Sequence, residues 1–186
     1  MTPRFLSIGL SFVLLACVWV APTLAQDRID RGNEEPRVSP NAAVSQTIGT
    51  TEVRITYGRP KVKGREIFGG LVSYGEVWRT GANEATTFSV SSDVTIEGEP
   101  LSAGTYSFYT IPGEDQWTLI FNNVAEQWGT DYDESKDALR VTVSPESGPQ
   151  REMMTFLFEN VTTDKGTCVL HWNRTHVPFE IQVAGN

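Results

Sequence analysis

Thr105-Tyr-Ser-Phe-Tyr-Thr-Ile111 and Trp117-Thr-Leu-Ile-Phe121 are two short runs rich in aromatic and β-branched residues, and Pro112-Gly113-Glu114-Asp115 lies between them. Proline fixes one backbone dihedral of a turn and glycine permits another, so this stretch predicts a β-hairpin. On its N-terminal side, residues 88–90 and 94–96 alternate apolar and polar side chains around a Ser-Ser-Asp turn. That period of two is typical of strands with one buried face.

The same alternation recurs along most of the chain, whereas almost nothing repeats at the helical period. Further strands are predicted around residues 53–57, 139–143, 154–158, 168–172 and 177–183. Only residues 124–128 and 133–138 have a pattern that allows a turn or two of helix. Eight or nine short strands separated by Gly, Pro, Asn and Asp predict an all-β fold, a single antiparallel β-sandwich.

The first 25 residues have the pattern of a secretory signal peptide. Arg4 gives a short positive start, residues 5–20 are apolar and uncharged, and Ala21-Pro-Thr-Leu-Ala25 ends in small residues before the polar Gln26. A transmembrane anchor is one alternative, but the apolar core is short for a span of about 20 residues. Lipidation at Cys17 is another, which the apolar residues directly after it disfavour. We therefore predict export to the periplasm or the medium, with cleavage after Ala25.

Residues 26–41 are polar, charged and aperiodic, so they predict a flexible leader before a β-sandwich domain at 42–186. Without Arg4 the exported chain keeps 14 basic against 23 acidic residues, a net charge of −9. Such a chain is not expected to bind nucleic acid, because that affinity depends on neutralising phosphates. Cys168 is its one cysteine, so no internal disulfide is expected, and its apolar surroundings predict a small buried side chain.

Residues 57–87, YGRPKVKGREIFGGLVSYGEVWRTGANEATT, form the longest segment without clean alternation. The segment is rich in glycine and gathers five basic residues in an otherwise acidic chain: Arg59, Lys61, Lys63, Arg65 and Arg79. Long irregular connections in compact domains are often functional, because a rigid scaffold presents them. This connection is therefore the best candidate for a functional surface.

Several stretches carry a family resemblance. They are NAAVSQTIG at 41–49, KGREIFGGL at 63–71, WRTGANEAT at 78–86, GTYS at 104–107 with IPG at 111–113, and YDESKDAL at 132–139. Together they resemble a family of exported bacterial proteins of unknown function, over about residues 39–183. The resemblance implies an exported, β-rich domain from a Gram-negative bacterium, and it carries over no activity, ligand or catalytic residue.

The side-chain chemistry of the 57–87 segment points to a ligand site. Guanidinium groups match carboxylate and phosphate geometry, aromatic rings offer stacking surface, and an amide with a carboxylate can complete a polar pocket. The predicted ligand-binding residues are Tyr57, Arg59, Arg65, Trp78, Arg79, Asn83 and Glu84. The alternative is that these arginines pair with Glu66, Glu76 and Glu84 and fasten a long loop to the sandwich.

Catalytic, cofactor and metal signatures are weak in comparison. His171 and His176 are the only histidines and lack a ligand spacing, and His171 is expected on the solvent side, opposite Cys168. There is no Gly-x-Ser-x-Gly motif, and no feature activates the thiol. Trp128 either offers an exposed stacking platform or covers one end of the sandwich. We therefore expect no metal site and no cofactor.

These patterns together predict an exported cell-envelope protein that binds a small anionic or carbohydrate ligand, or a protein partner, without catalysis. Two alternatives stay open. One is a hydrolase that uses Glu84 with a second group that the sequence does not identify. The other is a purely structural envelope protein.

Overall fold

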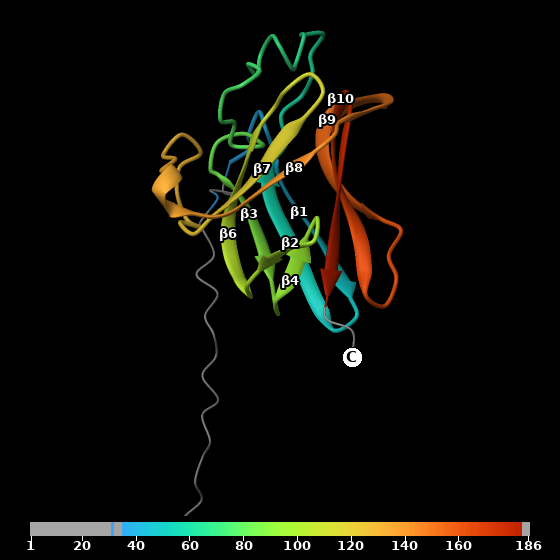
Figure 1. Cartoon of the computed structure of the whole chain (residues 1–186). Helices are drawn as coiled ribbons and strands as arrows, with labels where there is room; N and C mark the ends of the chain where they lie inside the picture. The colour runs from blue at the N-terminus through green and yellow to red at the C-terminus, as the bar shows by residue number, and fades with distance from the viewer. Residues whose placement is uncertain (1–30, 32–34, 184–186) are drawn as a thin grey trace, which may run out of the picture.

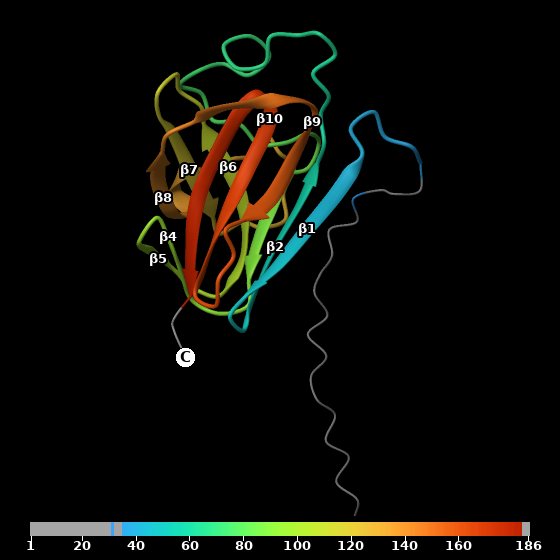
Figure 2. The ribbon, with the colours of Figure 1, turned by 90° about the vertical axis from the view of Figure 1, so that its right-hand side faces the viewer.

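The computed structural model describes Arg31 and residues 35–183, which form two antiparallel β-sheets packed face to face (Figures 1 and 2). The six-stranded sheet has the order β1-β2-β3-β6-β7-β8, with bounds Asn41–Ile48, Thr51–Gly58, Thr86–Val90, Gly104–Ile111, Trp117–Asn122 and Asp137–Val143. The four-stranded sheet has the order β5-β4-β10-β9, with bounds Glu99–Leu101, Val94–Ile96, Lys165–Val183 and Glu146–Glu159. The predicted antiparallel β-sandwich is confirmed, with ten strands in the described part of the chain. The predicted signal peptide at 1–25 lies outside the described residues.

The hairpin predicted from residues 105–121 forms the β6–β7 pair of the six-stranded sheet, with Phe108 opposite Phe121. Its turn needs Gly113, because a Cβ there would lie 2.3 Å from the carbonyl oxygen of Gln116. Both strands are apolar on successive residues because their outer face is also covered, by residues 123–136. Of the two short helices that the pattern allowed there, a single 3-10 turn forms, η1 (Glu134–Lys136).

Strand β10 doubles back on itself at Asn173, whose φ of 54° is left-handed (Figure 2). Near its two ends, the Val183 amide donates a hydrogen bond to the Asp164 carbonyl at 2.8 Å. Residues this far apart in sequence meet only if the strand has two antiparallel arms. These arms correspond to the strands predicted around 168–172 and 177–183.

Aromatic rings from both sheets make the centre of the core: Phe88, Phe108, Phe121, Phe156 and Phe179. The ring centroid of Phe108 lies 5.1 Å from that of Phe121 and 5.9 Å from that of Phe179. Such pairs add about 0.5–1.5 kcal/mol beyond the burial of area. Cys168 is fully buried, as predicted, and burial raises the pKa of its thiol, so the side chain stays protonated.

The 58–87 connection extends beyond one end of the sandwich (Figure 1). Two of its aromatic side chains, Phe68 and Trp78, pack into the core. Phe68 meets Trp117 edge to face at 4.7 Å, and Trp78 stacks on Trp172 at 5.8 Å. The Trp78 backbone also exchanges two hydrogen bonds with Thr110, at 2.7 and 2.9 Å. The connection is therefore anchored on its inner side, while Lys63, Arg65, Glu66 and Glu76 are left exposed.

Candidate functional site

Two of the predicted arginines are engaged by the protein's own oxygen atoms. Arg59 donates to the Met154 carbonyl at 2.8 Å and to the Thr155 hydroxyl at 2.7 Å, both on β9. Arg65 donates to two carbonyls of its own loop, at 3.0 and 2.6 Å. Within the described residues no carboxylate pairs with either guanidinium. These arginines fasten the connection, as the alternative expected, but through neutral oxygens instead of Glu66 and Glu76.

Two of the predicted aromatic residues, Tyr57 and Trp78, lie in the core. The Tyr57 hydroxyl accepts a hydrogen bond from the Phe156 amide at 3.1 Å, and the two rings meet edge to face at 4.9 Å. Burial raises the pKa of Tyr57. Trp78 is only 9% exposed and is stacked on Trp172. Both rings therefore build the scaffold beneath the surface, and neither has a free face for stacking.

The remaining predicted residues come together where two loop segments run side by side next to β3. The Gly129 amide donates to the Asn83 carbonyl at 3.2 Å, and Glu84 is bridged to Trp128 in antiparallel register. Asn83 has a φ of 67°, a left-handed conformation that its short polar side chain tolerates. This turn brings Glu84 and Trp128 next to each other.

Arg79 lies directly beneath this bridge. A Cβ at Gly129 would be 2.1 Å from Cδ of Arg79, so only glycine lets the two segments approach. Trp128 is 51% exposed, so of the two expectations for this ring the exposed platform holds. The Arg79 side chain and the exposed indole of Trp128 therefore lie on neighbouring segments, with Nε of Arg79 buried.

Glu84 is the most constrained side chain in this region. It is 7% exposed, and its two carboxylate oxygens accept hydrogen bonds from Arg37 at 2.7 and 2.8 Å. The hydrogen bond from Arg37 lowers the pKa of Glu84, although burial opposes the shift. Arg31 brings a second guanidinium, whose Nη2 donates to the Ala85 carbonyl at 2.8 Å. Glu84 is therefore held ionised in the folded protein.

We call Arg31, Arg37, Arg79, Glu84 and Trp128 the Glu84 cluster. Three guanidinium groups accompany one carboxylate, and in the described part of the chain neither Nη1 of Arg31 nor Nε of Arg79 has a hydrogen-bond partner. Sequence patterns gave no sign of Arg31 and Arg37, because both stand in the polar, aperiodic 26–41 segment. The composition of a polar segment does not show whether an arginine in it pairs with a carboxylate or is exposed to water.

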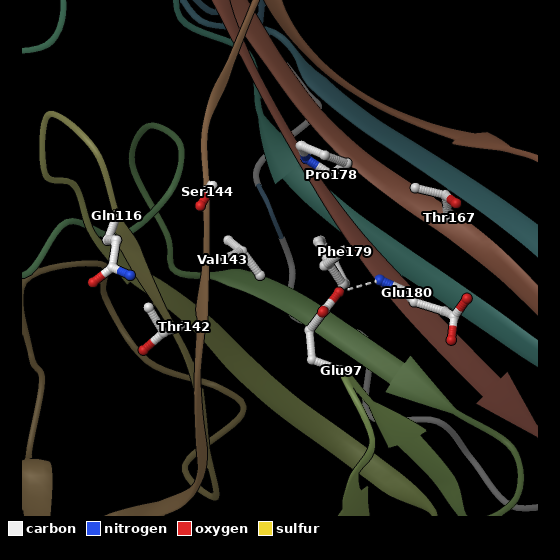
Figure 3. Close-up of a pocket in the computed structure, with 9 residues that line it drawn as sticks. All are labelled: Glu97, Gln116, Thr142, Val143, Ser144, Thr167, Pro178, Phe179 and Glu180. Atoms are coloured by element: carbon white, nitrogen blue, oxygen red, sulfur yellow. Dashed lines mark hydrogen bonds between the residues drawn. The ribbon is translucent and has the colours of Figure 1, made fainter.

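A groove of about 430 Å³ lies in a different part of the molecule, between β8 and β10 (Figure 3). Its lining comes from five separate stretches of the chain: Glu97, Gln116, Thr142, Val143, Ser144, Thr167, Pro178, Phe179 and Glu180. None of the predicted ligand-binding residues belongs to this lining. The polar lining residues sit on outward faces of strands and on turns, where their pattern resembles ordinary solvated surface.

The groove exists because β4 is shorter than its neighbour β10. Beyond the end of β4, the Glu97 carboxylate accepts a hydrogen bond from the Glu180 amide at 2.6 Å (Figure 3). In a β-strand, residues two apart direct their backbone N–H and C=O groups to the same side. Pro178 therefore faces the same edge of β10 as Glu180, whose amide bonds to Glu97. Proline has no N–H to leave unpaired there. The sheet therefore stops at Glu97 and leaves a hollow against β8.

Hydrogen-bonding capacity in the groove is largely unused. One carboxylate oxygen of Glu97 accepts a hydrogen bond from the Glu180 amide, and the Glu180 carboxylate pairs with Lys165 at 2.9 Å. Four other lining side chains make no hydrogen bond within the described residues: Gln116, Thr142, Ser144 and Thr167. An amide and three hydroxyls are therefore available to a ligand.

His171 is 3% exposed, so the expectation that it faces solvent was wrong. The first part of β9 crosses over it, with Nε2 of His171 2.8 Å from the Pro149 carbonyl and Nδ1 3.3 Å from the Arg151 side chain. The His176 ring lies 5.4 Å away and faces Glu146 at 3.6 Å. The described residues contain no group of three or more His, Cys, Asp or Glu side chains that could hold a metal ion.

His171 gives a pH prediction. Burial, together with the charges of Arg151 and His176, lowers the pKa of His171 below its ordinary 6.5, so the unfolded chain binds this proton more readily. The free energy of unfolding is then expected to fall as pH decreases below about 6.5, and to be unaffected by this group above that pH. Urea unfolding at a series of pH values measures this pH dependence. His171→Gln should make the free energy of unfolding less dependent on pH below about 6.5, and a variant with the same pH dependence as wild type would contradict the prediction.

Residues 39–181 match the model of a protein family of unknown function, DUF2911. The chain belongs to the DUF2911 family. The match confirms the resemblance carried by the motifs, and it spans the groove and the Glu84–Trp128 bridge, while Arg31 and Arg37 precede it. No curated protein and no solved structure shows a significant match to the chain. Among the described residues of this DUF2911 protein, no helix is long and apolar enough to cross a membrane.

Proposed function

We propose that this DUF2911 protein is an exported, non-catalytic binding module of the cell envelope, and that it holds a neutral carbohydrate in the groove between β8 and β10. The observation that supports this most is the set of unused side chains in the groove: Gln116, Thr142, Ser144 and Thr167. Export rests on the signal-peptide pattern of residues 1–25, which makes the mature chain periplasmic or secreted.

The size and polarity of the groove fit a small polyhydroxylated ligand. Its volume of about 430 Å³ falls within the range of about 300–1,000 Å³ that is usual for ligand pockets. Most such pockets are mainly apolar, whereas this one offers an amide, three hydroxyls and two carboxylates. Sugar hydroxyls both donate and accept, so they can satisfy every one of these groups. A ligand with fewer polar atoms would leave several of them desolvated and unpaired, which costs affinity.

The charge of the groove disfavours anions. Glu97 and Glu180 both line it, and among the described residues only Glu180 pairs with a cation, Lys165. A carboxylate or phosphate ligand would meet like charge at short range, where Coulomb repulsion is poorly screened. Pro178 adds half-buried apolar lining that can contact the C–H face of a sugar ring, whereas the side chains of Val143 and Phe179 are almost fully buried. A neutral sugar therefore fits better than an anionic one.

Thermal unfolding of the purified protein with cellobiose, maltose and N,N′-diacetylchitobiose as probes tests the proposal. A ligand present at 100 times its dissociation constant stabilises the folded state by about 2.7 kcal/mol, which shifts a melting curve clearly. We expect at least one probe to shift the curve. The double variant Gln116→Ala with Thr142→Val should lose that shift, because two of the unused polar groups are gone.

Arg79→Ala provides the matched control, because it changes the other candidate surface and leaves the groove intact. It should keep the carbohydrate-dependent shift. If none of the three sugars shifts the wild-type curve, or if the shift survives in the Gln116→Ala, Thr142→Val variant, the groove is not a carbohydrate site.

A small anion bound at the Glu84 cluster is the second candidate. Two observations support it: guanidinium groups outnumber the carboxylate, and one nitrogen each of Arg31 and Arg79 has no hydrogen-bond partner among the described residues. Guanidinium groups bind carboxylates and phosphates. Phosphate and citrate in the same melting assay separate the two candidates. An anion-dependent shift of the melting curve that Arg79→Ala removes, and that Gln116→Ala with Thr142→Val retains, would favour the anion over the sugar.

The two remaining alternatives have less support. A hydrolase that uses Glu84 as its acid would need a carboxyl group that carries a proton near neutral pH, and Arg37 instead holds Glu84 ionised. A purely structural envelope role leaves the unused side chains of the groove without a purpose. It becomes the better account if neither sugars nor anions bind.

A further inference from the structure

We infer that β1 is a self-association edge, through which two copies of the chain join their six-stranded sheets about a two-fold axis. Strand β1 is the outermost strand of that sheet and pairs with β2 in unbroken register. An edge strand carries alternate N–H and C=O groups that are ready to pair with another strand. Among the described residues, none pairs with the free edge of β1 between Ala42 and Ile48.

The composition of β1 is unusual for an edge. Its eight residues, NAAVSQTI, include no charged residue and no proline, and its pairing with β2 has no bulge. Soluble proteins usually protect a long edge with charges, proline, bulges or a covering loop. An unprotected edge of this length therefore indicates that something covers it.

The other edges of this chain have that protection. Strand β8 carries Asp137 and Arg140, and its pairing with β7 is interrupted by a register shift. Strand β5 is only three residues long and contains Pro100. Strand β9 has Pro149 in its first part, and the 58–87 connection bridges it at Met153. Pairing through β1 would therefore end with two copies and would not continue into a fibre.

A second copy fits the side chains of β1. The outward residues Ala43, Ser45 and Thr47 are exposed, small and uncharged, and Val44 on the other face is only half-buried. The exported chain has a net charge of −9, so approaches through most other surfaces bring like charges together, whereas β1 carries no charge. Two identical strands in antiparallel pairing are related by a two-fold axis, which closes the assembly as a dimer.

Sedimentation equilibrium of the purified chain tests this inference. We expect wild type to show reversible dimerisation, and Ser45→Glu with Thr47→Glu to weaken it by about tenfold or more, because carboxylates then face carboxylates across the two-fold axis. Thr142→Glu with Ser144→Glu is the matched control. It adds the same charge at exposed positions at the β8 edge and should leave dimerisation unchanged.

Variants of opposite charge distinguish a lost interface from a variant that fails to fold. The Ser45→Lys, Thr47→Lys variant should also be monomeric alone, but a mixture of the Lys and Glu variants should form a heterodimer. A wild-type chain that stays monomeric at its highest soluble concentration overturns the inference. So does a dimer that the Glu variant weakens no more than the control does, or a mixture of the two variants that remains monomeric.

Discussion

Phe108→Ala is expected to lower the free energy of unfolding by about 4 kcal/mol, which is the usual cost of removing a large aromatic side chain from a packed core. Phe108 is 1% exposed and lies where the two sheets meet. Its ring contacts Phe121 in its own sheet and Phe156 and Phe179 in the other, at centroid distances of 5.1, 6.0 and 5.9 Å. Neighbours fixed in two rigid sheets cannot easily close the cavity. Urea unfolding measures the loss.

Leu71→Ala is the control for this prediction. Leu71 is 49% exposed on the 58–87 connection, so its truncation should change the free energy of unfolding by no more than about 0.5 kcal/mol. If Phe108→Ala costs no more than Leu71→Ala, the aromatic cluster does not hold the sheets together as described. The two variants should unfold with the same denaturant slope as wild type, because the surface exposed on unfolding barely changes.

Glu84→Gln is expected to lower the free energy of unfolding by about 2 kcal/mol. The substitution removes the carboxylate that Arg37 contacts through both of its terminal nitrogens, next to a second charge on Arg31. Breaking a fully buried ion pair costs more, about 3–5 kcal/mol, but the Arg37 side chain is 24% exposed, and water screens part of the loss. Urea unfolding at neutral pH provides the measurement.

The double variant Glu84→Gln with Arg37→Met isolates the ion pair. It should be less destabilised than Glu84→Gln alone, because no partnerless charge is left behind. Since Arg37 lowers the pKa of Glu84, the pair stabilises the protein above the ordinary pKa of 4.5, and this contribution is lost as pH falls through the lower pKa of the folded state. A single variant as stable as wild type, or a double variant worse than the single, would show that the ion pair does not stabilise the fold.

The fold class could be predicted because its signals are local. The turn at Gly113 and the aromatic and β-branched runs on either side of it predict the β6–β7 hairpin, and alternation of apolar and polar residues marks both arms of β10. The predicted exposure of His171 was wrong because alternation along a strand only shows which residues share a face. Alternation does not show whether another strand covers that face, as the first part of β9 covers His171.

The candidate sites were harder to predict, for two different reasons. The arginine-rich segment was correctly picked out as unusual, but sequence could not show that Arg59 and Arg65 are engaged by nearby oxygens. The groove escaped notice because its lining is dispersed, from Glu97 to Glu180, and each polar residue looks like the solvent side of a strand. Only the early end of β4 turns them into a concave surface.

Strand β10 also constrains the order in which the molecule can form. Val94 of β4 pairs with Val183, and β9 pairs with the other arm, so the four-stranded sheet is assembled around the last strand of the described chain. Long-range pairings of this kind form late and slow folding, because loop-closure entropy must be overcome first. A polypeptide made from its N-terminus cannot complete its core until β10 is available. For the export that we propose, this late completion of the core would keep the chain unfolded until most of it has crossed the membrane.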